Sequence, residues 1–230
     1  MPTVAENLAR VRDRVAAACH RAGRDPGGVT LVAVTKYASA EQVGAVLAAG
    51  VRDLGENRPQ QLEERAGIYA NASPPVRWHQ IGQVQRNKAK KVVAHAHLTH
   101  SADSERLLVV LDRAAADCGA PASVLLQINV SGEDSKSGFA PDAARDLWAT
   151  DPAARFPHLR FRGLMTMAPA ADDPDAARPT FAGLRTLRDE LAGEDPSVLP
   201  ELSMGMSGDF EPAIEEGATI VRVGSVLFGT

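Results

Sequence analysis

The segment VTLVAVTK, residues 29–36, is an unbroken run of apolar and β-branched residues that ends in a lysine. Such a run is typical of a strand that is buried on both faces, as strands of parallel sheets are. Side chains alternate between the two faces of a strand, so Val32, Val34 and Lys36 share one face. We therefore expect Lys36 at the end of a buried strand, on the face that the two valines occupy.

Outward from this run, strand-like and helix-like segments alternate along the chain. Before it, Thr3 and Glu6 have the spacing of a helix capping box, and apolar residues recur at helical spacing until Gly23. After it, Ser39 and Gln42 have the same spacing. The apolar segments predict eight strands, at residues 29–35, 51–55, 76–81, 96–100, 123–130, 161–167, 202–206 and 219–223.

Strands that alternate with helices predict an α/β fold with a parallel sheet, and eight of them predict closure into a (β/α)8 TIM-type barrel. An open doubly wound sheet is the alternative, but no GxGxxG motif follows any predicted strand. The chain has 230 residues and no segment that reads as a linker. We expect one domain over residues 1–230, with the N-terminal helix added to the barrel.

The composition of the chain argues against nucleic-acid binding and against insertion in a membrane. The chain has 25 Lys and Arg against 29 Asp and Glu, a formal net charge of −4, and only 4% aromatic residues, which does not favour nucleic-acid binding. It has no signal-peptide pattern and no apolar run of the ~20 residues that span a bilayer. We expect a cytoplasmic monomer, with Cys19 and Cys118 as reduced thiols that pack as small apolar groups.

Active sites of such barrels lie at the carboxyl ends of the strands, where Lys36 is placed. Partial desolvation there favours the neutral amine that Schiff-base chemistry needs. The alternative is a lysine that extends toward solvent or pairs with Glu56.

Two loops at the same end of the predicted barrel suit a phosphate group. Ser207 and Gly208 follow the seventh strand, and Gly224 and Ser225 follow the eighth. Small residues let backbone amides approach an anion, and the loops after strands seven and eight are a recurrent phosphate site of these barrels. Ordinary turn chemistry uses the same residues, but two such loops on adjacent strands favour phosphate.

A reactive lysine beside a phosphate site fits pyridoxal 5'-phosphate (PLP), or a sugar phosphate in a Schiff-base aldolase. Arg222 shares a strand face with Ile220 and Gly224, so it should point inward beside the phosphate loop. At a pyridine nitrogen, an arginine would keep that nitrogen unprotonated and weaken the ring as an electron sink. The alternative is that Arg222 pairs with the phosphate, with Glu215 or with Glu216.

Ordered sequence blocks over nearly the whole chain resemble the PLP homeostasis proteins, which are similar to the N-terminal barrel of alanine racemase, a fold type III-like PLP barrel. The blocks are LVAVTK (31–36), LGEN (54–57), WHQIG (78–82), QRNK (85–88), HSAD (100–103), INVSG (128–132), SKSG (135–138), RGLMTM (162–167), LSMGMS (202–207), VRVGS (221–225) and FG (228–229).

The resemblance implies a covalent aldimine of PLP at Lys36 and Arg222 at the pyridine nitrogen. It also implies phosphate contacts from Ser207, Gly224 and Ser225. Further cofactor-binding residues that it implies are Asn57, near the ring, and His79 and Met167, which line the pocket. Gln80 departs from the family pattern, which has an apolar or aromatic residue there.

The family's role is to hold PLP for buffering or for delivery to PLP-dependent apoenzymes. The alternative, an amino-acid racemase, needs a second acid or base opposite the lysine. Alanine racemases use a tyrosine from a further domain, for which this chain has no residues to spare. We expect Tyr37 to point away from the Lys36 face, and Tyr69 to lie far from the strand ends. We therefore expect a PLP carrier without catalytic residues.

Two other clusters carry weaker hypotheses. The basic run Arg86, Lys88, Lys90 and Lys91 is interpreted as a solvated helix face, and a site for RNA, a partner or a second phosphate ligand is the alternative. His97 and His100 are expected on opposite faces of the fourth strand, which disfavours a metal site. We predict no bound metal.

Overall fold

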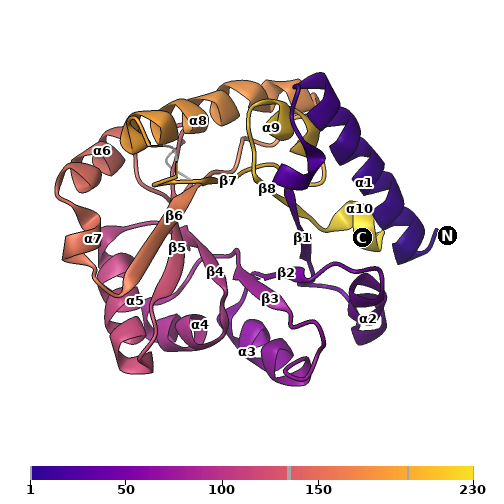
Figure 1. Ribbon diagram of the computed structural model, residues 1–230, viewed down its shortest axis with the longest axis horizontal. Coiled ribbons are helices and arrows are strands. Elements are labelled where there is room, and N and C mark those ends of the chain that lie inside the picture. The colour runs from indigo at the N-terminus through magenta and orange to yellow at the C-terminus, as the bar shows by residue number, and fades with distance from the viewer. Residues whose placement is uncertain (1, 134–135, 196, 230) are drawn as a thin grey trace.

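The computed structural model describes residues 2–133, 136–195 and 197–229, and its eight strands form a closed parallel barrel in the order of the sequence (Figure 1). The strands are β1 (Thr30–Val34), β2 (Asp53–Glu56), β3 (Arg77–Gln80), β4 (Leu98–Ala102), β5 (Ala122–Gln127), β6 (Leu159–Met165), β7 (Glu201–Ser203) and β8 (Ile220–Val223). The first strand pairs with the last, Val32 opposite Arg222, which closes the ring. The predicted TIM-type barrel is confirmed.

Helices surround the barrel and connect successive strands (Figure 1). They are α1 (Val4–Arg21), α2 (Ala40–Ala48), α3 (Pro59–Ile68), α4 (Ala89–His95), α5 (Glu105–Cys118), α6 (Pro141–Ala149), α7 (Pro152–Arg155), α8 (Arg178–Ala192), α9 (Phe210–Glu215) and α10 (Ser225–Phe228), with short 3-10 turns η1 (Pro26–Gly28), η2 (Arg86–Lys88) and η3 (Pro174–Ala177).

Local sequence explains where most of these helices begin. The two predicted capping boxes form, with the Thr3 hydroxyl accepting from the Glu6 amide and the Ser39 hydroxyl from that of Gln42. The sequence did not predict α6, α7 or α10. Helices α7 and α10 have only four residues each, and α6 and α7 each begin at a proline, which suits the first helical position.

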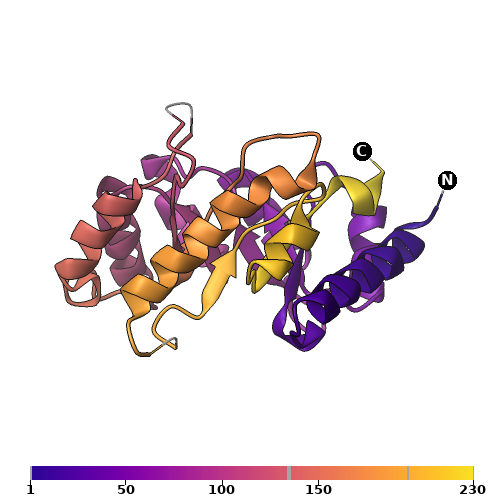
Figure 2. The same ribbon diagram turned by 90° about the horizontal axis from the view of Figure 1, so that it is seen from above.

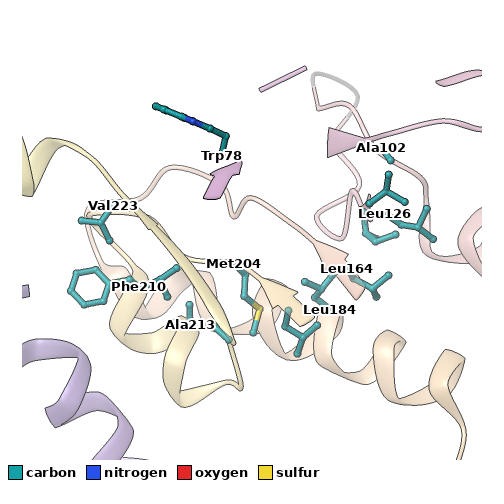
Figure 3. Packing of buried hydrophobic residues seen from close by; sticks show 14 of the residues in the cluster. Trp78, Ala102, Leu126, Leu164, Leu184, Met204, Phe210, Ala213 and Val223 are labelled. Atoms are coloured by element: carbon teal, nitrogen blue, oxygen red, sulfur yellow. The ribbon is translucent and has the colours of Figure 1, made fainter. Parts of the chain in front are cut away.

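The core consists of two layers. A small cluster inside the barrel contains Val32, Leu98, Leu125, Met165 and Ile220. A much larger cluster fills the space between the strands and the surrounding helices, and Figure 3 shows part of it, including Leu164 of β6 and Leu184 of α8. Several polar side chains share the barrel interior with the inner cluster, and these lead to the functional site.

The N-terminal helix α1 lies outside the barrel, next to α9 and α10, and both chain ends lie on that side (Figures 1 and 2). The Asn7 side-chain amide donates to the carbonyl of Leu227 at 3.0 Å. Arg14 pairs with Glu211 at 2.8 Å and lies 4.6 Å from the centre of the Phe210 ring. These contacts attach α1 to the segments that flank β8.

The two cysteines differ in their surroundings. Cys19 is buried, as expected, and burial raises the pKa of its thiol. Cys118 is exposed at the end of α5, so the prediction that it packs as a small apolar group is wrong. Within the described ranges, none of the helices combines the length and the apolar character that crossing a bilayer requires.

Candidate functional site

A cavity of about 770 Å³ opens at the carboxyl ends of the strands. It brings together residues from loops that are far apart in the sequence. Of the eight predicted cofactor-binding residues, seven line it: Lys36, Asn57, Met167, Ser207, Arg222, Gly224 and Ser225. His79 is not among the lining residues.

Lys36 lies in the turn that follows β1 and is half-buried. Its Nζ is 5.1 Å from the centre of the Tyr37 ring. The alternative pairing with Glu56 does not form, because that carboxylate accepts from the Thr35 hydroxyl at 2.5 Å and pairs with Arg65 at 3.2 Å. Lys36 therefore lines the cavity without an ion pair to this carboxylate.

Tyr37 was expected on the face opposite Lys36, and this expectation is wrong. Strand β1 ends at Val34, so the alternation of a strand no longer applies at the two following positions. Tyr37 lines the same cavity as Lys36 and is 74% exposed. A phenol therefore lies at the mouth of the site.

Arg222 points into the barrel, as predicted, and is only 4% exposed. Its guanidinium donates to the Ser203 hydroxyl at 2.6 Å and to the Thr166 carbonyl at 3.0 Å. Burial lowers the pKa of Arg222 to about 10, an effect that the charge of Asp209 partly opposes.

The alternative carboxylate partners of Arg222 are engaged elsewhere. Glu215 pairs with Arg21 and Arg178, and Glu216 pairs with Arg178 and Arg185. An arginine can donate five hydrogen bonds, so Arg222 keeps N–H groups for a ligand in the cavity.

The two loops predicted to hold phosphate meet at the cavity. The Gly224 amide donates to the Ser207 hydroxyl at 3.2 Å, which joins the loop after β7 to the loop after β8. A Cβ at Gly224 would lie 3.3 Å from both the Cβ and the carbonyl oxygen of Val34. Glycine thus lets the chain pass close to β1 directly beside the cavity.

His79 lies deeper than predicted. It is 2% exposed, and its ring bonds Asp53 and His100 inside the barrel. The rings of His97 and His100 both lie beside it, with centres 5.9 and 5.1 Å from its own, so the expectation that these two histidines diverge is wrong. Strand β4 begins only at Leu98 and has an irregular register, which removes the simple alternation.

The sequence analysis missed several residues that line the cavity. Gln127, Lys136 and Ser137 border it from the β5 side, and the Gln127 amide donates to the Ser137 carbonyl at 2.8 Å. They fall within or next to the sequence blocks 128–132 and 135–138, so their place near the site could have been found there. Lys136 forms an ion pair with Glu133 at 2.5 Å.

Comparisons with known proteins point to one family. The sequence model of the family described as alanine racemase, N-terminal domain, matches residues 6–230. Proteins named pyridoxal phosphate homeostasis protein are 44% identical in Pseudomonas aeruginosa (231 residues aligned, 100% of this chain and 96% of the relative) and 39% identical in Aquifex aeolicus (224 residues aligned, 97% and 96%).

Solved structures similar to this chain include a protein that has been determined with and without PLP. PipY of Synechococcus elongatus without PLP has a TM-score of 0.85 and 37% identity, covering 99% of this chain and 100% of PipY. PipY with PLP bound has a TM-score of 0.82 and 36% identity, with the same coverage. An alanine racemase from Streptomyces coelicolor has a TM-score of 0.67, 23% identity, and coverage of 97% of this chain and 58% of that one, so it supports the fold alone.

Proposed function

The chain belongs to the pyridoxal phosphate homeostasis protein family, as the sequence blocks predicted, and we propose that it holds PLP in the cytoplasm for buffering or for delivery to PLP-dependent apoenzymes. The observation that carries this proposal is that Lys36, Arg222 and the two joined small-residue loops line the same cavity. A relative of 36% identity that contains PLP supports it.

The residues of the cavity fit the cofactor. The aldehyde of PLP needs an amine to form a Schiff base, and Lys36 supplies an amine that does not pair with Glu56. A pyridine nitrogen can accept a hydrogen bond, and the buried guanidinium of Arg222 has N–H groups left to donate. A phosphate group needs close approach to backbone amides and hydroxyls, which Ser207, Gly224 and Ser225 allow.

In this assignment the amine of Lys36 would hold PLP through its aldehyde group. Bound PLP supplies a ring that withdraws electrons from an attached amine, most strongly when its nitrogen is protonated. Arg222 would donate to that nitrogen and, with a pKa of about 10, keeps its own proton at neutral pH. Placed there, the guanidinium would hold the ring nitrogen unprotonated, which would disfavour carbanion chemistry and suit a protein that keeps the cofactor intact.

The alternative is an amino-acid racemase that uses a second acid or base. Tyr37 is the residue to test, because its phenol borders the cavity beside Lys36. A Schiff-base aldolase is a weaker alternative, since it gives no reason for an arginine at the position of Arg222.

The central experiment is reduction of the PLP-loaded protein with borohydride, followed by peptide mapping. The expected result is one modified peptide that carries the reduced cofactor on Lys36, and loss of that label in Lys36→Ala. Labelling of Lys136, which borders the same cavity, in place of Lys36 would overturn the assignment.

A second experiment separates carrier from enzyme. The loaded protein is incubated with L-alanine or L-serine, and the D-isomer is measured by chiral chromatography. We expect no racemisation above that of free PLP. Racemisation that disappears in both Lys36→Ala and Tyr37→Phe would establish the enzyme instead.

A further inference from the structure

The barrel interior holds a continuous hydrogen-bonded chain that begins at Arg222. The Arg222 guanidinium donates to Ser203 Oγ at 2.6 Å, and Ser203 Oγ lies 2.8 Å from His100 Nδ1. His100 Nε2 lies 2.8 Å from His79 Nδ1, and His79 Nε2 lies 3.0 Å from Asp53 Oδ1. We propose that Asp53, His79, His100 and Ser203 form a positioning relay that orients Arg222 toward the cofactor.

The relay crosses the inside of the barrel. Ser203 is on β7 and His100 on β4, two strands that are not neighbours in the sheet, so the bond between them spans the interior. Both residues are 0% exposed, and His79 is 2% exposed. The far end is at the opposite mouth of the barrel, where Asp53 pairs with the half-exposed Arg77 beside a second cavity of about 430 Å³.

With both histidine rings neutral, the directions of all four hydrogen bonds follow from the two ends. A carboxylate only accepts and a guanidinium only donates. Asp53 must therefore receive the Nε2–H of His79, which leaves His79 Nδ1 to accept from His100 Nε2–H. His100 Nδ1 then accepts from the Ser203 hydroxyl, whose oxygen is free to receive Arg222.

No position in this chain has two donors or two acceptors facing each other, so the assignment is consistent from both ends. It requires both histidines to be neutral and protonated at Nε2. Burial, together with the nearby charge of Arg222, holds the pKa of His100 well below its usual range, in agreement with a neutral His100 ring.

A purely structural role explains these residues poorly. Barrel interiors are usually filled by Val, Ile and Leu, and a buried polar group that lacks a partner costs free energy. Among the described residues, Arg222 has no carboxylate in direct contact, and the relay instead connects it to the negative charge of Asp53. An arginine held at two N–H groups presents its remaining ones to the cavity in one orientation.

The first test uses the protein without cofactor and so does not depend on the proposed function. Nitrogen-15 NMR of the histidine rings distinguishes protonated from unprotonated ring nitrogens. We expect protons only at Nε2 of both His79 and His100. In Asp53→Asn the terminal amide can donate as well as accept, so protons should also appear at Nδ1 of both rings. Nδ1 protonation in the unsubstituted protein, or Nδ1 protonation of one ring without the other in Asp53→Asn, would refute the relay.

The second test asks whether the relay reaches the cofactor, and it rests on the proposed PLP binding. Ser203→Ala removes the hydroxyl that Arg222 contacts, and we expect PLP affinity to fall roughly tenfold, with a shift in the absorption spectrum of the bound cofactor. The matched control is Ser101→Ala, since Ser101 is equally buried and donates to the carbonyl of Gly82 outside the relay.

Equal spectra and affinities in Ser203→Ala and Ser101→Ala would show that Ser203 does not position Arg222. If Ser203→Ala does not fold, the NMR comparison with Asp53→Asn still decides whether the relay exists. If the unsubstituted protein does not bind PLP, the proposed function fails while the NMR result stands.

Discussion

Gly82 lies so close to Asn57 that a Cβ added to Gly82 would be 2.2 Å from the Asn57 carbonyl oxygen. The same carbonyl accepts a hydrogen bond from the side-chain amide of Gln80 at 3.2 Å, and that amide also donates to the Gly82 carbonyl at 2.9 Å. Gln80 thus connects the two cavity-lining segments that follow β2 and β3.

Gly82→Ala is expected to displace the Asn57 backbone, because the clash involves main-chain atoms that cannot rotate away. We predict a loss of about 1–3 kcal/mol in the free energy of unfolding, together with weaker PLP binding. Urea unfolding and a PLP titration measure the two effects.

The control is Gly44→Ala, at a position inside α2 where an added Cβ meets no atom within 4 Å. It should raise the free energy of unfolding by about 0.5–1 kcal/mol, as glycine replacement in a helix does. A Gly82→Ala protein as stable as the unsubstituted one would contradict the close packing at Asn57.

Strand alternation predicted the site where the strand is regular and misled where it ends. Ile220, Arg222 and Gly224 alternate along and just beyond β8, so the inward direction of Arg222 followed from spacing alone. Tyr37 follows a strand that stops at Val34, and its direction depends on the turn. Local sequence does not encode where such a turn aims a side chain.

The relay was beyond sequence analysis for a different reason. His100 and Ser203 are 103 positions apart, and they meet only because the sheet closes and leaves room between β4 and β7. The alternation of strands and helices predicts closure, but not which side chains touch across the interior. His79 was therefore assigned to the cavity that its neighbours line, although it lies below it.

Asp53 should make the free energy of unfolding depend on pH in the acidic range. Burial alone would raise the pKa of this carboxyl, but hydrogen bonds from His79 and Arg77, and their charges, lower it from 3.8 to about 2. A carboxyl with a lowered pKa stabilises the fold above its unfolded pKa, and this contribution disappears as the pH falls from about 4 toward 2. At 1.36 kcal/mol for each pKa unit, it amounts to about 2 kcal/mol.

Urea unfolding of the unsubstituted protein and of Asp53→Asn at several pH values measures this contribution. The difference between their free energies of unfolding should be greatest above about pH 4 and shrink at lower pH. A difference that stays constant across this window would mean that Asp53 is not held as a carboxylate by its two partners.

Glu56 should act in the opposite direction. It is fully buried, and burial raises its pKa above the usual 4.5 despite the hydrogen bond from Thr35 and the charge of Arg65. A carboxyl with a raised pKa gives its full contribution to stability below its unfolded pKa and loses it as the pH rises through the folded value. We therefore expect the unsubstituted protein to lose stability relative to Glu56→Gln as the pH increases above about 4.5. Paired urea titrations between about pH 4 and pH 8 test this. A gain in the stability of the unsubstituted protein relative to Glu56→Gln over this range would contradict the prediction.

The joined loops after β7 and β8 make a prediction about ligand choice. If Ser207 and Ser225 contact the phosphate, removing either hydroxyl should weaken PLP binding roughly tenfold, since hydrogen bonds to charged groups contribute more than neutral ones. Pyridoxal, which lacks the phosphate, serves as the internal control, and its affinity should change little in Ser207→Ala and Ser225→Ala. Both affinities follow from absorbance titrations of the same protein samples. Equal losses for PLP and pyridoxal would mean that these serines shape the cavity as a whole and do not contact the phosphate.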